Sequence, residues 1–201
     1  MTEASEISLN NATPAPLPVV LHVGCGVPDP AKLPAAYFPQ SLWRELRLDI
    51  DPGVEPDIQA SITDMAAVAS GSVDAVWSAH NIEHLFAHEV PLALAEFARV
   101  LRPGGFMLVT MPDLQQVAAL VAQDLLEDAA YQSMMGPISP LDIIFGHGAS
   151  IAAGNHFMAH RTGFTAHTLA AHLARAGFAD VQVERDGRFA LWARAVNPAT
   201  P

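Results

Sequence analysis

Residues 21–26 read Leu21-His22-Val23-Gly24-Cys25-Gly26, and this stretch decides the fold. Val19–Val23 is a short apolar run, typical of a buried parallel strand, and it ends directly at Gly24. Two glycines separated by one residue let the backbone turn sharply and approach a bound nucleoside where a Cβ atom would collide. The stretch therefore predicts the strand-and-loop end of a nucleoside-binding site.

Further apolar runs predict more strands and helices. The predicted strands cover residues 46–50, 57–60, 73–78, 106–111, 180–184 and 189–196. Helices are predicted over residues 89–101 and 165–176, the second with Thr165 as N-cap and Gly177 as its stop. Alternating strands and helices indicate a parallel sheet with helices on both faces. The polar gap 185–188 contains Gly187 and predicts a closing hairpin, which places an antiparallel strand near one edge.

The 201 residues suit a single domain. Residues 1–18 are polar and then proline-rich without periodicity, so we expect a flexible leader before a domain at 19–201. Residues from about 114 to 164 are first helical in pattern and then rich in glycine and histidine, and are expected as an insertion over the carboxyl edge of the sheet. The apolar face of residues 114–125 could bury against a second subunit and form a homodimer.

The composition of the chain limits the classes of partner that we expect it to bind. Ten basic and 21 acidic residues give a net charge of −11, which argues against nucleic acid and anionic membranes as partners. No apolar run approaches the roughly 20 residues that a membrane-spanning helix needs. Cys25 is the only cysteine, so an internal disulfide is excluded and a cytoplasmic protein is expected. We expect Cys25 to be a compact buried filler, and Trp43, Trp77 and Trp192 to serve packing.

Four pieces of the chain together resemble the class I S-adenosylmethionine-dependent methyltransferases, of the kind called methyltransferase type 11. They are residues 21–26, 48–52 (LDIDP), 72–85 (SVDAVWSAHNIEHL) and 99–105 (RVLRPGG). The resemblance runs from residue 19 to residue 196. It implies an α/β fold with a doubly wound, Rossmann-like seven-stranded sheet of order 3-2-1-4-5-7-6, in which strand 7 is antiparallel. It also implies methyl transfer from S-adenosylmethionine, for which we expect a small-molecule acceptor.

The cofactor site follows from the residues and from this resemblance. An acidic residue at the end of the second strand accepts hydrogen bonds from ribose hydroxyls, and spacing favours Asp49 over Asp51 for this role. His22, Pro28 and Ser61 depart from the family pattern, and Asp64 could replace Ser61 at the adenine. The implied cofactor-binding residues are Val23, Gly24, Cys25, Gly26, Asp49, Ile50, Ser61, Ile62 and His80.

The acceptor side is expected to hold polar groups that can position an acceptor or take its proton. The candidate catalytic residues are His80, Asn81, Asp113, His156 and His160. His84 is expected in a structural or cofactor-side role. Four histidines suggest a metal hypothesis, but their segment has no cysteine and a single acid, so we expect no metal and favour imidazoles that line the acceptor pocket. These histidines are His147, His156, His160 and His167.

Two other functions stay open. A nicotinamide-dependent oxidoreductase would need a third glycine at position 29, which is Asp29. A non-catalytic module that binds S-adenosylmethionine on the same fold is kept open by His22, Pro28 and Ser61. Saturable cofactor binding without turnover would favour this module.

Overall fold

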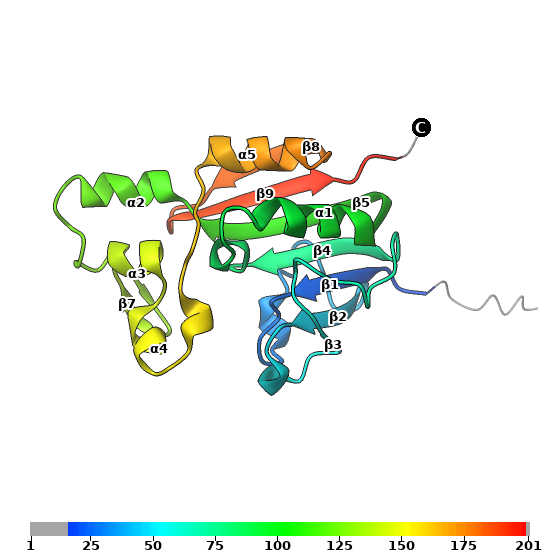
Figure 1. The fold of residues 1–201 in the computed structure, drawn as a ribbon, viewed down its shortest axis with the longest axis horizontal. Coiled ribbons are helices and arrows are strands. Elements are labelled where there is room, and N and C mark those ends of the chain that lie inside the picture. Colours follow the sequence, from blue (N-terminus) through cyan, green and yellow to red (C-terminus); the bar gives the residue numbers. More distant parts are fainter. Residues whose placement is uncertain (1–15, 200–201) are drawn as a thin grey trace, which may run out of the picture.

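A mixed sheet of seven strands, in the order β3-β2-β1-β4-β5-β9-β8, forms the centre of the molecule (Figure 1). The computed structural model describes residues 16–199. β1 to β5 pair in parallel, whereas β9 pairs antiparallel with both β5 and β8. This confirms the predicted strand order and the antiparallel strand near the edge. Of the predicted leader at 1–18, residues 1–15 lie outside the described part of the chain.

The strand bounds lie close to the predicted ones. The strands are β1 (Val19–Val23), β2 (Arg44–Asp49), β3 (Ile58–Gln59), β4 (Val73–Ala79), β5 (Leu101–Pro112), β8 (Ala179–Arg185) and β9 (Ala190–Val196). The largest shift is at β5, which begins before the predicted residue 106 because its register against β4 is irregular near Asp74. Gly105 permits this close passage, since a Cβ atom there would lie 2.8 Å from the Asp74 carbonyl oxygen.

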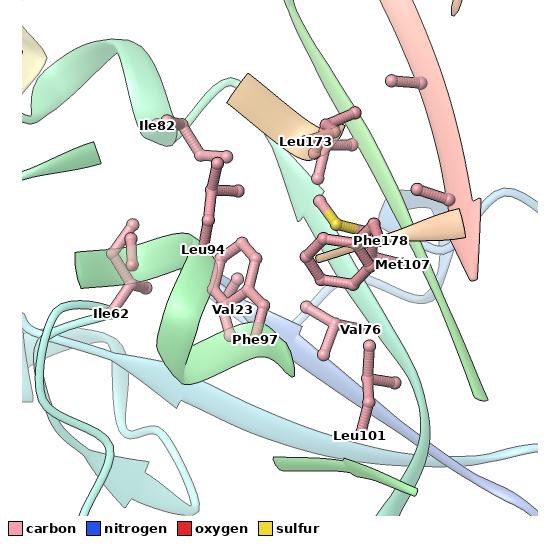
Figure 2. Packing of buried hydrophobic residues seen from close by; sticks show 14 of the residues in the cluster. Val23, Ile62, Val76, Ile82, Leu94, Phe97, Leu101, Met107, Leu173 and Phe178 are labelled. Atoms are coloured by element: carbon pink, nitrogen blue, oxygen red, sulfur yellow. The ribbon is translucent and has the colours of Figure 1, made fainter. Parts of the chain in front are cut away.

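Two helices cover one face of the sheet. α1 (Val90–Val100) and α5 (Ala166–Arg175) both contribute to the large core cluster that contains the alternate strand residues Leu21 and Val23. Figure 2 shows this packing, with Phe97 and Leu94 of α1 over Val23, and Leu173 of α5 near Phe178. Thr165 caps α5 as predicted and forms a capping box with Thr168. Burial of these amphipathic faces fixes both helices on the sheet.

The opposite face is covered differently from the prediction of helices on both faces. Between β1 and β2, the segment 27–43 has a single 3₁₀ turn, η1 (Pro30–Lys32), because its prolines do not suit a regular helix. Phe38 is fully buried and its ring stacks on Phe106 at 5.8 Å. Trp77 stacks on Trp192 at 5.6 Å in the same layer. The predicted packing role of the tryptophans is confirmed here.

The insertion is more ordered than the predicted loop system. It contains α2 (Leu114–Val121), the hairpin β6 (Tyr131–Ser133) and β7 (Gly136–Ile138), α3 (Pro140–Phe145), α4 (Gly148–Ala152) and η4 (His156–Met158). Val117, Ile138 and Ile143 form a small core of its own, which covers part of the predicted apolar face of α2. Figure 1 shows the insertion beside the carboxyl ends of β1 and β4. Within residues 16–199, every helix is too short or too polar to cross a membrane.

Candidate functional site

A cavity of about 380 Å³ lies at the carboxyl ends of β1, β2 and β4. The sheet side of its wall includes the loop after β1 and the first residues beyond β4. The opposite wall comes from the insertion, through Phe157, Met158 and Arg161. Carboxyl ends of parallel strands are where ligands bind in open α/β sheets, because the diverging loops leave a crevice there. The insertion forms the wall of this crevice that lies opposite the sheet.

The loop after β1 has a conformation that needs glycine. Gly24 and Gly26 have φ angles of +63° and +57°, in the left-handed region that side chains disfavour. A Cβ atom on Gly24 would lie 2.6 Å from Cγ of Asn81, so the loop and the residue after β4 fit closely. Lys32 donates to two carbonyls of the loop at 3.1 and 2.8 Å, and Arg47 donates to a third at 2.6 Å. These bonds hold the loop rigid at the cavity wall.

Asp49 stands at the end of β2 and lines the cavity. One carboxylate oxygen accepts from the Gly26 N–H at 2.8 Å, and the other accepts from the Asp51 N–H at 3.0 Å. A carboxylate oxygen accepts more than one hydrogen bond, so each still has capacity for a hydroxyl. Asp51 instead uses its carboxylate to cap η2 (Pro52–Val54) through the Gly53 N–H. Asp51 lines the cavity as well, and Asp49 is the acid that is hydrogen-bonded to the glycine loop.

His80 follows β4 with a φ angle of +47°, which is unusual for a residue with a side chain. Such strained positions concentrate at functional sites. Its Nδ1 lies 3.2 Å from Oε1 of Glu83. The His80 side chain is 55% exposed. Partial desolvation acts to lower its pKa, but the hydrogen bond and the charge of Glu83 outweigh this and raise the pKa. The imidazole is thus poised to carry a proton at the cavity.

Glu83 lies in η3 (Ile82–His84) and is completely buried. Burial acts to raise its pKa, but the hydrogen bond with His80 and the charges of His80 and His84 outweigh it and lower the pKa. Glu83 is therefore a buried carboxylate rather than a carboxylic acid at neutral pH. Its Oε1 faces His80, while Oε2 has no hydrogen-bond partner among the described residues.

A second cavity of about 160 Å³ adjoins the first, and His80 and His84 line both. It extends into the insertion and reaches Ile143 and His160. Nδ1 of His160 lies 2.9 Å from the Ile143 carbonyl oxygen, and its ring packs edge-on against His84 at 4.9 Å. Burial lowers the pKa of His160, which favours the neutral ring.

Most of the predicted cofactor residues meet at the first cavity. Val23 and Cys25 are the exceptions, since both are buried and neither lines it. Burial raises the pKa of the Cys25 thiol, which agrees with its predicted role as a filler. The predicted cofactor residues that do line this cavity are Gly24, Gly26, Asp49, Ile50, Ser61, Ile62 and His80.

The acceptor-side candidates are divided. His80 and Asn81 line the first cavity, and His160 lines the second. Asp113 lines neither of the two: it is fully buried, caps α2 through the Gln115 N–H and pairs with Arg185 at 2.9 Å, so its carboxylate has a structural task. His156 is exposed and also lines neither cavity. The structure therefore brings neither Asp113 nor His156 to these two cavities.

Several lining residues were missed by sequence reasoning. His84 was expected in a structural or cofactor-side role rather than as a candidate site residue, and it lines both cavities. Arg161 and Phe157 come from the insertion, whose path over the sheet no local pattern reveals. His22 points away from the cavity, where it pairs with Glu45 at 2.6 Å. Burial lowers the pKa of His22, although the Glu45 hydrogen bond opposes this.

Known proteins are similar to this chain in part of its sequence and in its fold. Residues 21–109 match the family model described as a methyltransferase domain. No curated protein matches the sequence. Among solved structures, the fold is similar to that of 1,6-didemethyltoxoflavin-N1-methyltransferase from Burkholderia thailandensis, whose structure holds 1,6-didemethyltoxoflavin and S-adenosylhomocysteine. The TM-score is 0.54 and the identity is 17%, over 90% of this chain and 72% of that one.

Two further structures have the same fold. A SAM-dependent methyltransferase from Methanosarcina mazei has a TM-score of 0.58 and 14% identity, over 92% of this chain and 94% of that one. An O-methyltransferase family protein from Burkholderia thailandensis has a TM-score of 0.59 and 11% identity, over 92% of this chain but only 52% of that one. Residues 21–109 therefore match a methyltransferase domain, and the chain has the fold of these S-adenosylmethionine-dependent methyltransferases.

Proposed function

We propose that this protein binds S-adenosylmethionine in the cavity at the carboxyl ends of β1, β2 and β4 and transfers its methyl group to a small-molecule acceptor. The observation that carries the proposal is the pairing of Asp49 with the glycine loop. Asp49 keeps acceptor capacity on both oxygens beside Gly24 and Gly26, where the backbone is bare of side chains. Such an arrangement suits a nucleoside with two adjacent hydroxyls.

The residues present fit the parts of this cofactor. A Cβ on Gly24 would collide with the Asn81 side chain, so only glycine lets Asn81 lie this close to the loop at the cavity. Ile50 is 51% exposed at the cavity and offers an apolar surface for the adenine. Ser61 and Ile62 line the same cavity. When bound, the cofactor supplies a methyl group on a sulfonium, which is a good leaving group.

The chain's own task is then to orient the acceptor and to exclude water. His80 and Asn81 stand between the glycine loop and the insertion, where the acceptor would enter. Phe157 and Met158 supply apolar contacts, and Arg161 supplies a positive charge. A cavity of about 380 Å³ with one wall from the insertion suits a small acceptor. The neighbour from Burkholderia thailandensis named above holds 1,6-didemethyltoxoflavin together with S-adenosylhomocysteine.

The test is turnover. Purified protein is incubated with S-adenosylmethionine and a panel of small hydroxyl, amine and carbon acceptors, and S-adenosylhomocysteine is followed by mass spectrometry. Acceptor-dependent formation of S-adenosylhomocysteine that falls in Asn81→Ala supports the proposal. Tight cofactor binding without turnover on any acceptor would instead favour the non-catalytic binding module.

A further inference from the structure

Three metal-binding side chains meet on the acceptor side of the cavity. Glu83, His84 and His160 each offer one ligand atom, and these atoms all lie within 4.8 Å of one another. Glu83 and His84 belong to η3, while His160 follows η4 at the end of the insertion. The backbone N–H groups of Arg161 and Thr162 donate to the Glu83 carbonyl at 2.9 and 3.2 Å. The returning chain is therefore fixed against η3, and His160 is held close to the other two.

One of the two oxygens of the Glu83 carboxylate lacks a partner in the described part of the chain, while the other faces His80. Its Oε2 is buried and has no hydrogen-bond partner among the described residues, although Glu83 is completely buried. A buried carboxylate oxygen without a partner costs several kcal/mol, so such groups are usually paired or bound to a cation. The other two members of the cluster are imidazoles, which are themselves ligands of divalent metal ions. A cation between these groups would compensate the free oxygen.

The two histidines have ring nitrogens suited to this role. Nδ1 of His160 lies 2.9 Å from the Ile143 carbonyl oxygen, which only accepts, so the neutral ring donates there and keeps a lone pair on Nε2. Each ring nitrogen of His84 lies 3.1 Å from a backbone carbonyl, that of Ala159 or that of His80. A neutral His84 donates to one carbonyl, and its other nitrogen would exchange its contact with the second carbonyl for the ion. Metal-binding histidines commonly donate their second ring nitrogen to a backbone carbonyl in this way.

We propose that Glu83, His84 and His160 form a binding site for a divalent transition-metal ion on the acceptor side of the cavity. Two imidazoles and one carboxylate are a donor set suited to Zn²⁺, Fe²⁺ or Co²⁺ and leave coordination positions open. The sequence led us to expect no metal, because the four histidines considered there lie in one segment with a single acid. Of those four, only His160 belongs to the proposed site, and its partners come from η3.

The proposal also narrows the acceptor, and this part rests on the proposed function. His84 lines both cavities, so an ion bound beside it would face the place where an acceptor enters. A hydroxyl oxygen that binds the ion becomes more acidic and releases its proton to solvent. The oxygen lone pair then forms the new bond to the methyl carbon, and the electron pair of the breaking carbon–sulfur bond stays on sulfur. The site thus favours hydroxyl acceptors over amine or carbon acceptors.

The test is a titration of the metal-free full-length protein, without a histidine tag, with Co²⁺. Binding is followed by visible absorption, which reports nitrogen and oxygen ligands, and Zn²⁺ is then added in competition. We expect one Co²⁺ per chain in the wild type and displacement by Zn²⁺. His160→Ala should weaken binding by on the order of 100-fold. His167→Ala is the matched control, since His167 is exposed on α5, and it should bind Co²⁺ like the wild type.

The wild-type titration decides the proposal even if a variant fails to fold. Absence of saturable Co²⁺ and Zn²⁺ binding would overturn it, and so would equal binding by wild type and folded His160→Ala. Calorimetry with S-adenosylhomocysteine, run with and without EDTA, separates this failure from that of the proposed function. Cofactor-product binding without metal binding overturns only the metal site. Metal binding without cofactor-product binding overturns the proposed function and leaves the metal site standing.

Discussion

Gly24→Ala should destabilise the protein and weaken its binding of S-adenosylhomocysteine. The φ angle of +63° at Gly24 costs a residue with a side chain about 1–2 kcal/mol. The new Cβ would also lie 2.6–2.9 Å from three side-chain atoms of Asn81, which must then move. Displacing a packed side chain costs about 1–3 kcal/mol. The two contributions together lower the free energy of unfolding by about 2–5 kcal/mol.

Gly104→Ala is the matched control. Gly104 has a φ angle of +78°, but a Cβ there would meet no atom within 4 Å. It should therefore show the backbone cost alone, about 1–2 kcal/mol. Urea unfolding measures both variants, and calorimetry measures their affinity for S-adenosylhomocysteine. Adding Asn81→Ala to Gly24→Ala should recover part of the lost stability. Equal destabilisation by both substitutions, with unchanged affinity in Gly24→Ala, would refute the reasoning.

Three further substitutions test the fold. Arg99 donates a hydrogen bond to the Glu96 carboxylate and lowers its pKa, so ionised Glu96 stabilises the folded state. This stabilisation is complete above the unfolded pKa of about 4.3 and is lost as the pH falls through the folded pKa. Glu96→Gln should thus destabilise the protein at pH 7, and its difference from the wild type in urea unfolding should shrink as the pH falls below about 4.3. A pH-independent difference would contradict this. Phe38→Ala should lower the free energy of unfolding by about 3–5 kcal/mol, because its buried ring packs segment 27–43 against the sheet. Thermal unfolding measures this, and a decrease below about 1 kcal/mol would contradict that role. Arg185→Met should cost about 1–3 kcal/mol in urea because the buried Asp113 loses its ion pair, and full stability would show that the pair is dispensable.

The sequence predicted the sheet well because its signals are local. The apolar run before Gly24 and the acid at Asp49 mark strand ends directly, and Gly187 marks the hairpin that makes β9 antiparallel. Thr165 and Gly177 bound α5 through backbone rules that hold in any context. Expecting helices on both faces was less successful. The prolines of segment 27–43 do not suit a regular helix, and aromatic side chains cover this face of the sheet instead.

The acceptor side was harder to predict because it depends on contacts between distant segments. The His84 ring reaches the Ala159 carbonyl across 75 positions of the chain, and nothing in either local pattern indicates this. His156 and His160 are histidines of the same segment, yet His156 is exposed and only His160 lines the second cavity. Asp113 follows β5 as a functional acid would, but the arrival of Arg185 from β8 makes it structural. Tertiary packing, rather than residue type, decides these roles.

The most direct test of the proposed function is calorimetric titration of wild type and Asp49→Ala with S-adenosylhomocysteine. Asp49 binds two backbone N–H groups and is proposed to hold the ribose hydroxyls, so circular dichroism must first confirm that the variant is folded. A hydrogen bond to a charged group contributes about 1.5–3 kcal/mol, so we predict one site in the wild type and an affinity lower by on the order of 10-fold to 100-fold in the variant. Absence of binding by wild type, or equal affinity in folded Asp49→Ala, would contradict the account.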